Sequence, residues 1–233
     1  MPSPDEELTA VKREIREIGR EVAARFKGEG ADSEARYRAL IGDEGYDGTL
    51  GTFVDRQATA DLPRWRPEYL EYSFGSRVAG DRYDPRSTER PAVIPLTEGA
   101  GDVLLLRGKV DRVDVDGNAM LVIDYKTGKA PSYKSLEKGY SMQLQLYLLA
   151  CAQLLGLEPA GGAYYQLKDD GFGMQLRVAD PRYKDALGGT PTPYATGLQK
   201  DLERTLSNAR EALEGMAAGA FHPVDSLEQE RCP

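Results

Sequence analysis

Apolar residues recur at helical spacing along the first 26 residues of the chain. Charged residues stand between them, so this segment is expected to form an amphipathic helix. The apolar positions are Val11, Ile15, Ile18, Val22 and Phe26. The run Ser3-Pro4-Asp5-Glu6 supplies an N-cap candidate and acidic first-turn residues. Two shorter helices are predicted near Glu34–Ile41 and Thr52–Ala60.

Beyond Pro67 the pattern changes to short apolar runs separated by turn residues, which is typical of strands. The predicted strands are Tyr69–Phe74, Ala92–Leu96, Val103–Asp114, Ala119–Tyr125, Gly162–Leu167 and Met174–Val178. Asp116-Gly117-Asn118 lies between two of these runs and predicts a hairpin. The predicted helices are Ser135–Leu155, with apolar Met142, Leu146, Leu149 and Ala150 on one side, and Thr196–Ala218. This order of elements predicts a mixed α/β or α+β domain.

Composition narrows the class of protein. No run of the sequence approaches the roughly 18 apolar residues that a membrane helix needs, and the N-terminus lacks a signal-peptide core. Two cysteines, Cys151 and Cys232, form neither a disulfide framework nor a metal-ligand cluster, so a reducing cytoplasm is expected. The net charge of −8 argues against a simple basic nucleic-acid-binding module. It is compatible with a site that gathers carboxylates around a divalent cation.

The candidate chemistry lies in two neighbouring segments, Arg107–Asp114 and Val122–Gly128. The hairpin turn between them allows Asp111 to lie on the strand beside Asp124 and Lys126. Because side chains alternate along a strand, Asp124 and Lys126 share one face and Tyr125 faces the other. Carboxylates and substrate phosphate oxygens suit Mg²⁺, which polarises a phosphate and activates water, while a lysine stabilises developing charge. Taken alone, Asp-Tyr-Lys at a strand end is also the pattern of a surface ion pair.

Four motifs in order favour the catalytic interpretation. They are Glu71-x-x-Phe74-Gly75, Gly108-x-x-Asp111-Arg112-x-Asp114, Ile123-Asp124-Tyr125-Lys126-Thr127-Gly128 and Gln143-x-x-x-Tyr147. Together they resemble the PD-(D/E)XK nuclease superfamily, and more narrowly its RecB/AddB-like branch. The resemblance covers about Tyr69 to Ala150. It implies a restriction-endonuclease-like core, in which helices flank a mixed β-sheet.

The resemblance also implies roles for the matching residues. Asp111 and Asp124 would bind Mg²⁺ or Mn²⁺, with the carbonyl of Tyr125 as a further ligand, and Lys126 would be the catalytic lysine. Glu71 would approach the metal; otherwise it is an ordinary strand carboxylate. Gln143 and Tyr147 would hold the active site or the DNA strand from the adjoining helix. The alternatives are a solvated helix position for Gln143 and a core aromatic for Tyr147.

The chain departs from the family at the histidine ligand. RecB-like sites usually add a histidine from an upstream helix, whereas His222, the one histidine here, stands near the C-terminus and is expected to be non-catalytic. Asp55, in Gly51-Thr52-Phe53-Val54-Asp55, is an alternative ligand in the histidine's place. The favoured explanation is that the chain is the C-terminal nuclease part of a longer protein and that the histidine segment is absent from it. The chain is expected to form a single nuclease domain, with a helical part at 1–66 and a catalytic core at 67–233.

Partners and activity follow from the same resemblance. The expected function is a metal-dependent DNA exonuclease of recombination or repair that acts on single strands or ends, with a helicase as a candidate partner. Four thiolates are needed for the iron–sulfur cluster of many relatives, so none is expected here. Thr127-Gly128-Lys129-Ala130 does not form a Walker motif, so any motor activity resides elsewhere. The rival interpretations are an inactive nuclease-fold module that binds DNA or a helicase, and an unrelated metal-dependent phosphoesterase.

Overall fold

The computed structural model describes most of the chain. The described residues are 3–26, 28, 30–43, 45–59, 62, 64–77, 82–96, 101–167 and 172–220. The expectations about His222 and Cys232 fall outside these ranges.

Three helices form the N-terminal part of the fold, and all three were predicted from the sequence. They are α1 (Pro4–Ala24), α2 (Ala31–Ile41) and α3 (Gly48–Ala58). Ser3 and Glu6 cap α1 reciprocally, each side chain accepting a hydrogen bond from the other residue's backbone N–H. Helix α1 packs closely on α3, because a Cβ added to Gly19 would lie 2.4 Å from Leu50 Cδ1.

The apolar side of α1 is largely uncovered. No residue of this helix is fully buried. Phe26, the last of the predicted apolar positions, lies just beyond the end of the helix. Val11, Ile18, Val22 and Phe26 are all exposed, the last to 79%. The amphipathic pattern therefore predicted the helix correctly, but the apolar side of that helix is not buried in the structure.

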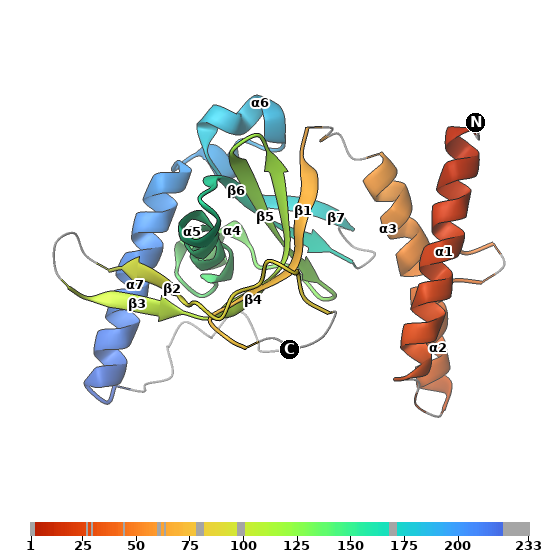
Figure 1. The fold of residues 1–233 in the computed structure, drawn as a ribbon, viewed down its shortest axis with the longest axis horizontal. Coiled ribbons are helices and arrows are strands. Elements are labelled where there is room, and N and C mark those ends of the chain that lie inside the picture. Colours follow the sequence, from red (N-terminus) through yellow and green to blue (C-terminus); the bar gives the residue numbers. More distant parts are fainter. Residues whose placement is uncertain are drawn as a thin grey trace.

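A five-stranded mixed sheet forms the centre of the fold (Figure 1), in the order β1-β4-β5-β6-β7. Its strands are β1 (Arg66–Phe74), β4 (Gly108–Asp116), β5 (Ala119–Lys126), β6 (Glu158–Gln166) and β7 (Gly173–Ala179). Strands β5 and β6 are parallel, and the other neighbours are antiparallel. The predicted β4–β5 hairpin is confirmed, with Asp116 paired to Ala119 and Gly117 at φ +61°. The predicted mixed sheet with flanking helices is also confirmed.

The single strand predicted over Val103–Asp114 is wrong. Strand β3 (Val103–Leu106) pairs with β2 (Ala92–Pro95) in a separate two-stranded sheet, and β4 begins two residues later at Gly108. The break falls at Arg107, whose side chain lies against Gly75 at φ +75°, where a Cβ would be 2.6 Å from Arg107 Cγ. This contact joins residues far apart in the sequence, so apolar periodicity gave no sign of it.

The single helix predicted over Ser135–Leu155 is also wrong. It is divided into α4 (Tyr133–Glu137) and α5 (Gln143–Leu155). Gly139, at φ +74°, lies between them and packs so closely on Asn208 that a Cβ would be 2.5 Å from Asn208 Nδ2. The buried side of α5 also differs from the prediction. It comprises Leu144, Gln145, Leu148, Ala150 and Cys151, whereas Leu146 and Leu149 are half-buried.

The closing part of the chain completes both faces of the sheet. Helix α7 (Leu198–Ala217) confirms the predicted final helix. The short elements before it are η1 (Pro181–Tyr183), α6 (Lys184–Leu187) and η2 (Thr192–Tyr194). None of the helices in the described ranges is long and apolar enough to cross a membrane.

Each face of the sheet has its own core. On one face of the sheet lie α5, α7 and the β2–β3 ribbon (Figure 1). The core on this face includes Val113, Met120 and Val122. On the other face, Leu121 and Ile123 pack with Trp65 and the segment around α6. Alternate residues of β5 therefore belong to different cores, and this alternation fixes the face on which each polar side chain at the strand end lies.

Three of the four sequence motifs meet in the core beneath α5. The Phe74 and Tyr147 rings contact edge to face, with centroids 6.3 Å apart. A Cβ added to Gly108 would lie 2.9 Å from Tyr147 Cε1 and 3.1 Å from Phe74 Cζ. Gly108 thus allows both rings to approach the β4 backbone, and this packing seats the first half of α5 on the sheet.

We predict that Gly108→Ala destabilises the protein by about 1–3 kcal/mol, because the added methyl group overpacks this contact. Urea unfolding followed by circular dichroism measures the change. Gly128→Ala is the matched control, since a Cβ at Gly128 would meet nothing within 4 Å. Equal unfolding midpoints for the two variants would show that Gly108 has no packing role.

Candidate active site

The candidate site lies where the pairing between β4 and β5 ends. The paired residues stop at Arg112 and Ile123, although β4 continues along β1 to Gly108 and β5 continues along β6 to Lys126. Asp111 and Asp124 are the next residue on each strand beyond the last pair. The predicted placement on adjacent strands is therefore confirmed.

At this point the Asp111 carboxylate accepts a hydrogen bond that a backbone carbonyl would accept in a continuous ladder. Its Oδ2 accepts a hydrogen bond of 2.9 Å from the backbone N–H of Tyr125. Burial raises the pKa of the Asp111 carboxyl above its usual value. The Tyr125 hydrogen bond opposes that effect, and the carboxylates of Asp124 and Glu71 raise the pKa further. Asp111 therefore lies within the electrostatic range of two other acids.

Lys126 links the second carboxylate to helix α5. Its Nζ lies 2.6 Å from Asp124 Oδ2 and donates a 3.0 Å hydrogen bond to Gln143 Oε1. Gln143 Nε2 in turn donates to the hydroxyl of Tyr147 over 3.5 Å. The sequence placed these four residues at one site, and the structure brings them into one connected chain of contacts.

Glu71 lies beside the site in an unusual backbone conformation. The pairs Leu70–Arg112 and Tyr72–Val110 bracket it, so it stands opposite Asp111. Its φ of +56° is the one positive value at a non-glycine position in the described ranges, and such conformations cost free energy. Its carboxylate pairs with Lys109 Nζ, a contact that the sequence did not predict.

On β1 and on β4, the alternation of side chains between the two faces of the sheet is interrupted at this position. On β1, Tyr69 and Tyr72 face the same core although they are three positions apart, and on β4 the same holds for Val110 and Val113. Strict alternation along a strand would place such pairs on opposite faces. The irregularity therefore changes the aim of Glu71 and Asp111 relative to what the sequence pattern predicts.

Two carboxylates at this position fit a hard divalent cation. Asp124 Oδ2 is buried and lacks a hydrogen-bond donor of good geometry in the described ranges, although Lys126 balances its charge. No three His, Cys, Asp or Glu side chains of the described residues lie together as a metal-binding group. Mg²⁺ is commonly bound by one or two carboxylates, with waters and substrate phosphates completing its shell. Asp111 and Asp124 match that donor set.

The other candidate residues lie elsewhere. Asp55, considered in place of the histidine ligand, forms a 2.7 Å ion pair with Lys12 of α1. Cys151 is fully buried in the α5 core, and burial raises the pKa of its thiol to about 12. The structure therefore gives Asp55 a role in joining helices and Cys151 a role in packing.

Tyr164 is a site neighbour that sequence reasoning missed. Its ring lies 5.3 Å from Lys126 Nζ, and its hydroxyl hydrogen bonds with Ser141 over 3.0 Å. The register explains the contact, because Tyr164 pairs with Asp124 across the parallel β5–β6 ladder. No local signal in the sequence could have indicated it, since a parallel partner is fixed by the crossover and not by a turn.

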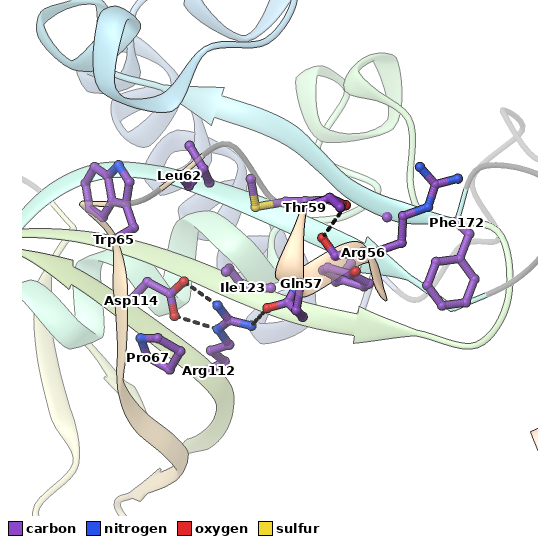
Figure 2. A pocket seen from close by; sticks show the side chains of 13 residues that line it. Arg56, Gln57, Thr59, Leu62, Trp65, Pro67, Arg112, Asp114, Ile123 and Phe172 are labelled. Carbon is purple, nitrogen blue, oxygen red and sulfur yellow. Dashed lines mark hydrogen bonds and ion pairs between the residues drawn. The ribbon is translucent and has the colours of Figure 1, made fainter. Parts of the chain in front are cut away.

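A pocket of about 540 Å³ lies on the opposite face of the sheet. Figure 2 shows Asp114 and Gln57 on either side of the Arg112 guanidinium, with Trp65 and Leu62 further along the wall. Arg112 donates to both Asp114 oxygens, at 2.5 and 2.6 Å, and to Gln57 Oε1 at 2.7 Å. Burial opposes the charge on Arg112, but its bonds to Asp114 raise the pKa of the guanidinium overall.

The buried Arg112–Asp114 pair connects the sheet face opposite the candidate site to helix α3. Arg112 and Asp114 are 10% and 3% exposed at their side chains, and Gln57 comes from the helical N-terminal part. Arg112 also lies 3.4 Å from the hydroxyl of Tyr125, the residue whose backbone holds Asp111. Phe53 of α3 packs on the Tyr125 ring with centroids 6.0 Å apart. Helix α3 thus supports the strand ends from behind.

Comparison with known proteins agrees with this geometry. The family model of the PD-(D/E)XK nuclease superfamily matches residues 3–233. A relative from Staphylococcus haemolyticus, named as a subunit of an ATP-dependent helicase/deoxyribonuclease, is 32% identical over 153 residues, which cover 60% of this chain and 12% of that protein. A protein of the same name from Clostridium botulinum is 32% identical over 143 residues, which cover 60% of this chain and 11% of the relative. The matched part of the chain thus spans only 11–12% of these relatives' length.

We predict that Asp111→Asn raises the free energy of unfolding by about 1 kcal/mol in EDTA, because it removes a buried charge that lies near two other carboxylates. The Asn side-chain oxygen still accepts the Tyr125 hydrogen bond. Thermal melts compare this variant with Asp102→Asn, a change at an exposed position. A lower melting temperature for Asp111→Asn than for the parent would contradict this prediction.

We predict that Asp114→Ala costs about 3–5 kcal/mol, because it leaves the buried Arg112 without its counter-ion. Asp116→Ala is the control, since its partner Arg64 is 70% exposed and such pairs contribute about 0–1 kcal/mol. The double variant Arg112→Met/Asp114→Leu should recover most of the loss. Urea unfolding measures all three, and equal losses for the two single variants would mean that the buried pair behaves as a surface one.

Proposed function

We propose, since the chain belongs to the PD-(D/E)XK nuclease superfamily, that it hydrolyses phosphodiester bonds of DNA with the help of Mg²⁺ or Mn²⁺. One observation carries the proposal. Asp111, Asp124 and Lys126 gather where the β4–β5 ladder ends, with Lys126 held between Asp124 and Gln143. In a simple surface ion pair, the lysine would contact only its carboxylate partner. Lys126 contacts both Asp124 of β5 and Gln143 of α5.

Each residue has a distinct task in this proposal. Asp111 and Asp124 would hold the cation, with the carbonyl of Tyr125 as a further ligand. When bound, the cation polarises the phosphate and lowers the pKa of a coordinated water. Lys126 stabilises the negative charge that develops on the phosphoryl oxygens. Gln143 is a positioning residue, because it fixes the Lys126 ammonium by accepting its hydrogen bond.

Tyr147 and Glu71 have supporting tasks. The Tyr147 hydroxyl accepts from Gln143, so it fixes the orientation of that amide, while its ring anchors α5 against Gly108 and Phe74. Glu71 stands opposite Asp111 and is held by Lys109. Glu71 would be a further residue that could help to hold the cation, in place of its ion pair with Lys109.

The biological role proposed here is that of an exonuclease in DNA recombination or repair, acting in the cytoplasm on single strands or ends. The relatives named as helicase/deoxyribonuclease subunits support that role and suggest a helicase domain or subunit as a partner. Residues 1–66 would then be the helical part, and 67–233 the catalytic core, of one nuclease domain within a longer protein.

One observation favours an alternative, a catalytically impaired module that binds DNA or a helicase. In the described ranges, no third acidic, His or Cys side chain joins Asp111 and Asp124 as a metal-binding group. Glu71, the nearest candidate, is engaged with Lys109. The two candidates differ in one measurable respect, which is whether added Mg²⁺ or Mn²⁺ leads to cleavage of bound DNA.

We predict that Lys126→Ala lowers the rate of single-stranded DNA cleavage by on the order of 10²-fold or more, because it removes charge stabilisation at the phosphate. A labelled oligonucleotide is incubated with the chain and Mg²⁺ or Mn²⁺, and fragments are quantified over time. Thermal melts check that the variant is folded at the assay temperature, because the change removes the charge that balances the buried Asp124 carboxylate.

Lys184→Ala is the matched control for this experiment. Lys184 is an exposed lysine of α6, beside the core of the opposite face, so its loss should leave the rate unchanged. Cleavage by Lys126→Ala at the parent's rate would remove Lys126 from the mechanism. DNA binding without cleavage in either metal would favour the impaired module.

A further inference from the structure

One loop begins directly after Lys126, at the end of β5, and leads to a residue whose side chain contacts Lys126. We call residues 127–142 the basic loop; it connects β5 to α5 and contains α4. The residue before it is Lys126, and the residue after it is Gln143, whose Oε1 lies 3.0 Å from Lys126 Nζ. Near its end, Ser141 hydrogen bonds with Tyr164, the ring beside Lys126. Both ends of the loop are therefore held at the proposed catalytic lysine.

The charge of this loop is opposite to that of the whole chain. It carries Lys129, Lys134 and Lys138 against a single carboxylate, Glu137, whereas the chain has a net charge of −8. All three lysines are exposed. None of them forms an ion pair in the described part of the chain, unlike cations elsewhere such as Lys12 and Arg86. These charges are therefore available to an external anion.

An exposed aromatic ring accompanies the lysines. Tyr140 is 50% exposed, and Lys138 Nζ lies 5.6 Å from the centre of its ring. Tyr133, by contrast, is half-buried and its hydroxyl hydrogen bonds with Thr196. An exposed aromatic ring beside cations is the combination that binds an unpaired base and the neighbouring phosphates.

The loop is held in place by contacts on its inner side. Gln166 Oε1 of β6 accepts a 3.1 Å hydrogen bond from the backbone N–H of Ala130. Arg177 of β7 donates over 2.7 Å to the carbonyl of Pro131. Leu136 of α4 is 1% exposed and belongs to the α5 core. The lysines thus project from an anchored frame, so binding a ligand would cost little loop ordering.

We propose that the basic loop is the surface that binds single-stranded DNA and leads it to Lys126, a proposal that rests on the nuclease function above. Lys129, Lys134 and Lys138 contact successive phosphates, and Tyr140 stacks on a base. A duplex offers the same phosphates but keeps its bases paired, so the exposed Tyr140 ring favours a single strand.

The first test measures binding of fluorescently labelled oligothymidylate to the full 233-residue chain by anisotropy, in EDTA and over a range of salt concentrations. Replacing Lys129, Lys134 and Lys138 together by Gln should lower the slope of log affinity against log salt by about 2, because each phosphate contact on a single strand contributes about 0.7. The affinity itself should fall by about 10-fold or more at low salt. Lys134→Gln and Lys184→Gln form a matched pair of single variants, and only the first should weaken binding.

The second test separates stacking from charge. Tyr140→Ala should weaken oligothymidylate binding by on the order of 10-fold, with the salt slope unchanged, whereas Tyr140→Phe should keep the parent's affinity. Neither change should weaken binding of a blunt duplex. Thermal melts check that each variant is folded; since all the changed side chains are exposed, melting temperatures should match the parent's.

The outcomes separate this proposal from the proposed function. Parent affinity and salt slope in the triple lysine variant would overturn the basic loop as the binding surface, even if the chain cuts DNA and Lys126→Ala does not. Equal losses for single-stranded and duplex DNA in Tyr140→Ala would overturn the single-strand preference. A parent chain that neither binds nor cuts DNA would overturn both proposals.

Discussion

The hydrogen bond from the Tyr125 N–H to Asp111 is the constraint on which the site depends. The β4–β5 ladder ends at Arg112 and Ile123, so the N–H of Tyr125, two residues beyond Ile123, needs a different acceptor. The Asp111 carboxylate supplies it, and the side chain is thereby fixed beside the strand that carries Asp124 and Lys126. The hairpin, the continuing β1 and β6 pairings and the packing of α3 all hold the two strands so that this exchange is possible.

Stability and chemistry compete at this point. Near the ladder end, burial and the carboxylates of Asp124 and Glu71 raise the pKa of Asp111. Glu71 adds a left-handed backbone conformation. The surrounding fold offsets these costs with well-packed contacts: the Phe74, Gly108 and Tyr147 packing seats α5, and the buried Arg112–Asp114 pair supports the strands from behind. Stored strain and clustered charge at a well-supported position are typical of functional sites.

Much of the site could be predicted from local patterns. The Asp-Gly turn indicated the hairpin, and period-two alternation placed Asp124 and Lys126 on one face, so the strand neighbours were correct. The motif that resembles the nuclease family paired Gln143 with Tyr147, and the structure joins them. The errors lay at Arg107 and Gly139, where strand and helix are interrupted by contacts with Gly75 and Asn208. Those partners are distant in the chain, so the apolar pattern continued across the breaks.

By itself, the sequence determined most of the elements, the hairpin, and the neighbouring strands on which Asp111, Asp124 and Lys126 lie. Turn residues and alternation act over a few positions, and their geometry is fixed by the backbone. The tertiary structure alone decided that Glu71 pairs with Lys109, that Tyr164 lies beside Lys126, and that Gln57 of α3 reaches the buried Arg112. It also decided where β4 separates from β5. These features depend on pairing between distant strands and on the packing of helices against them, and no local pattern encodes either.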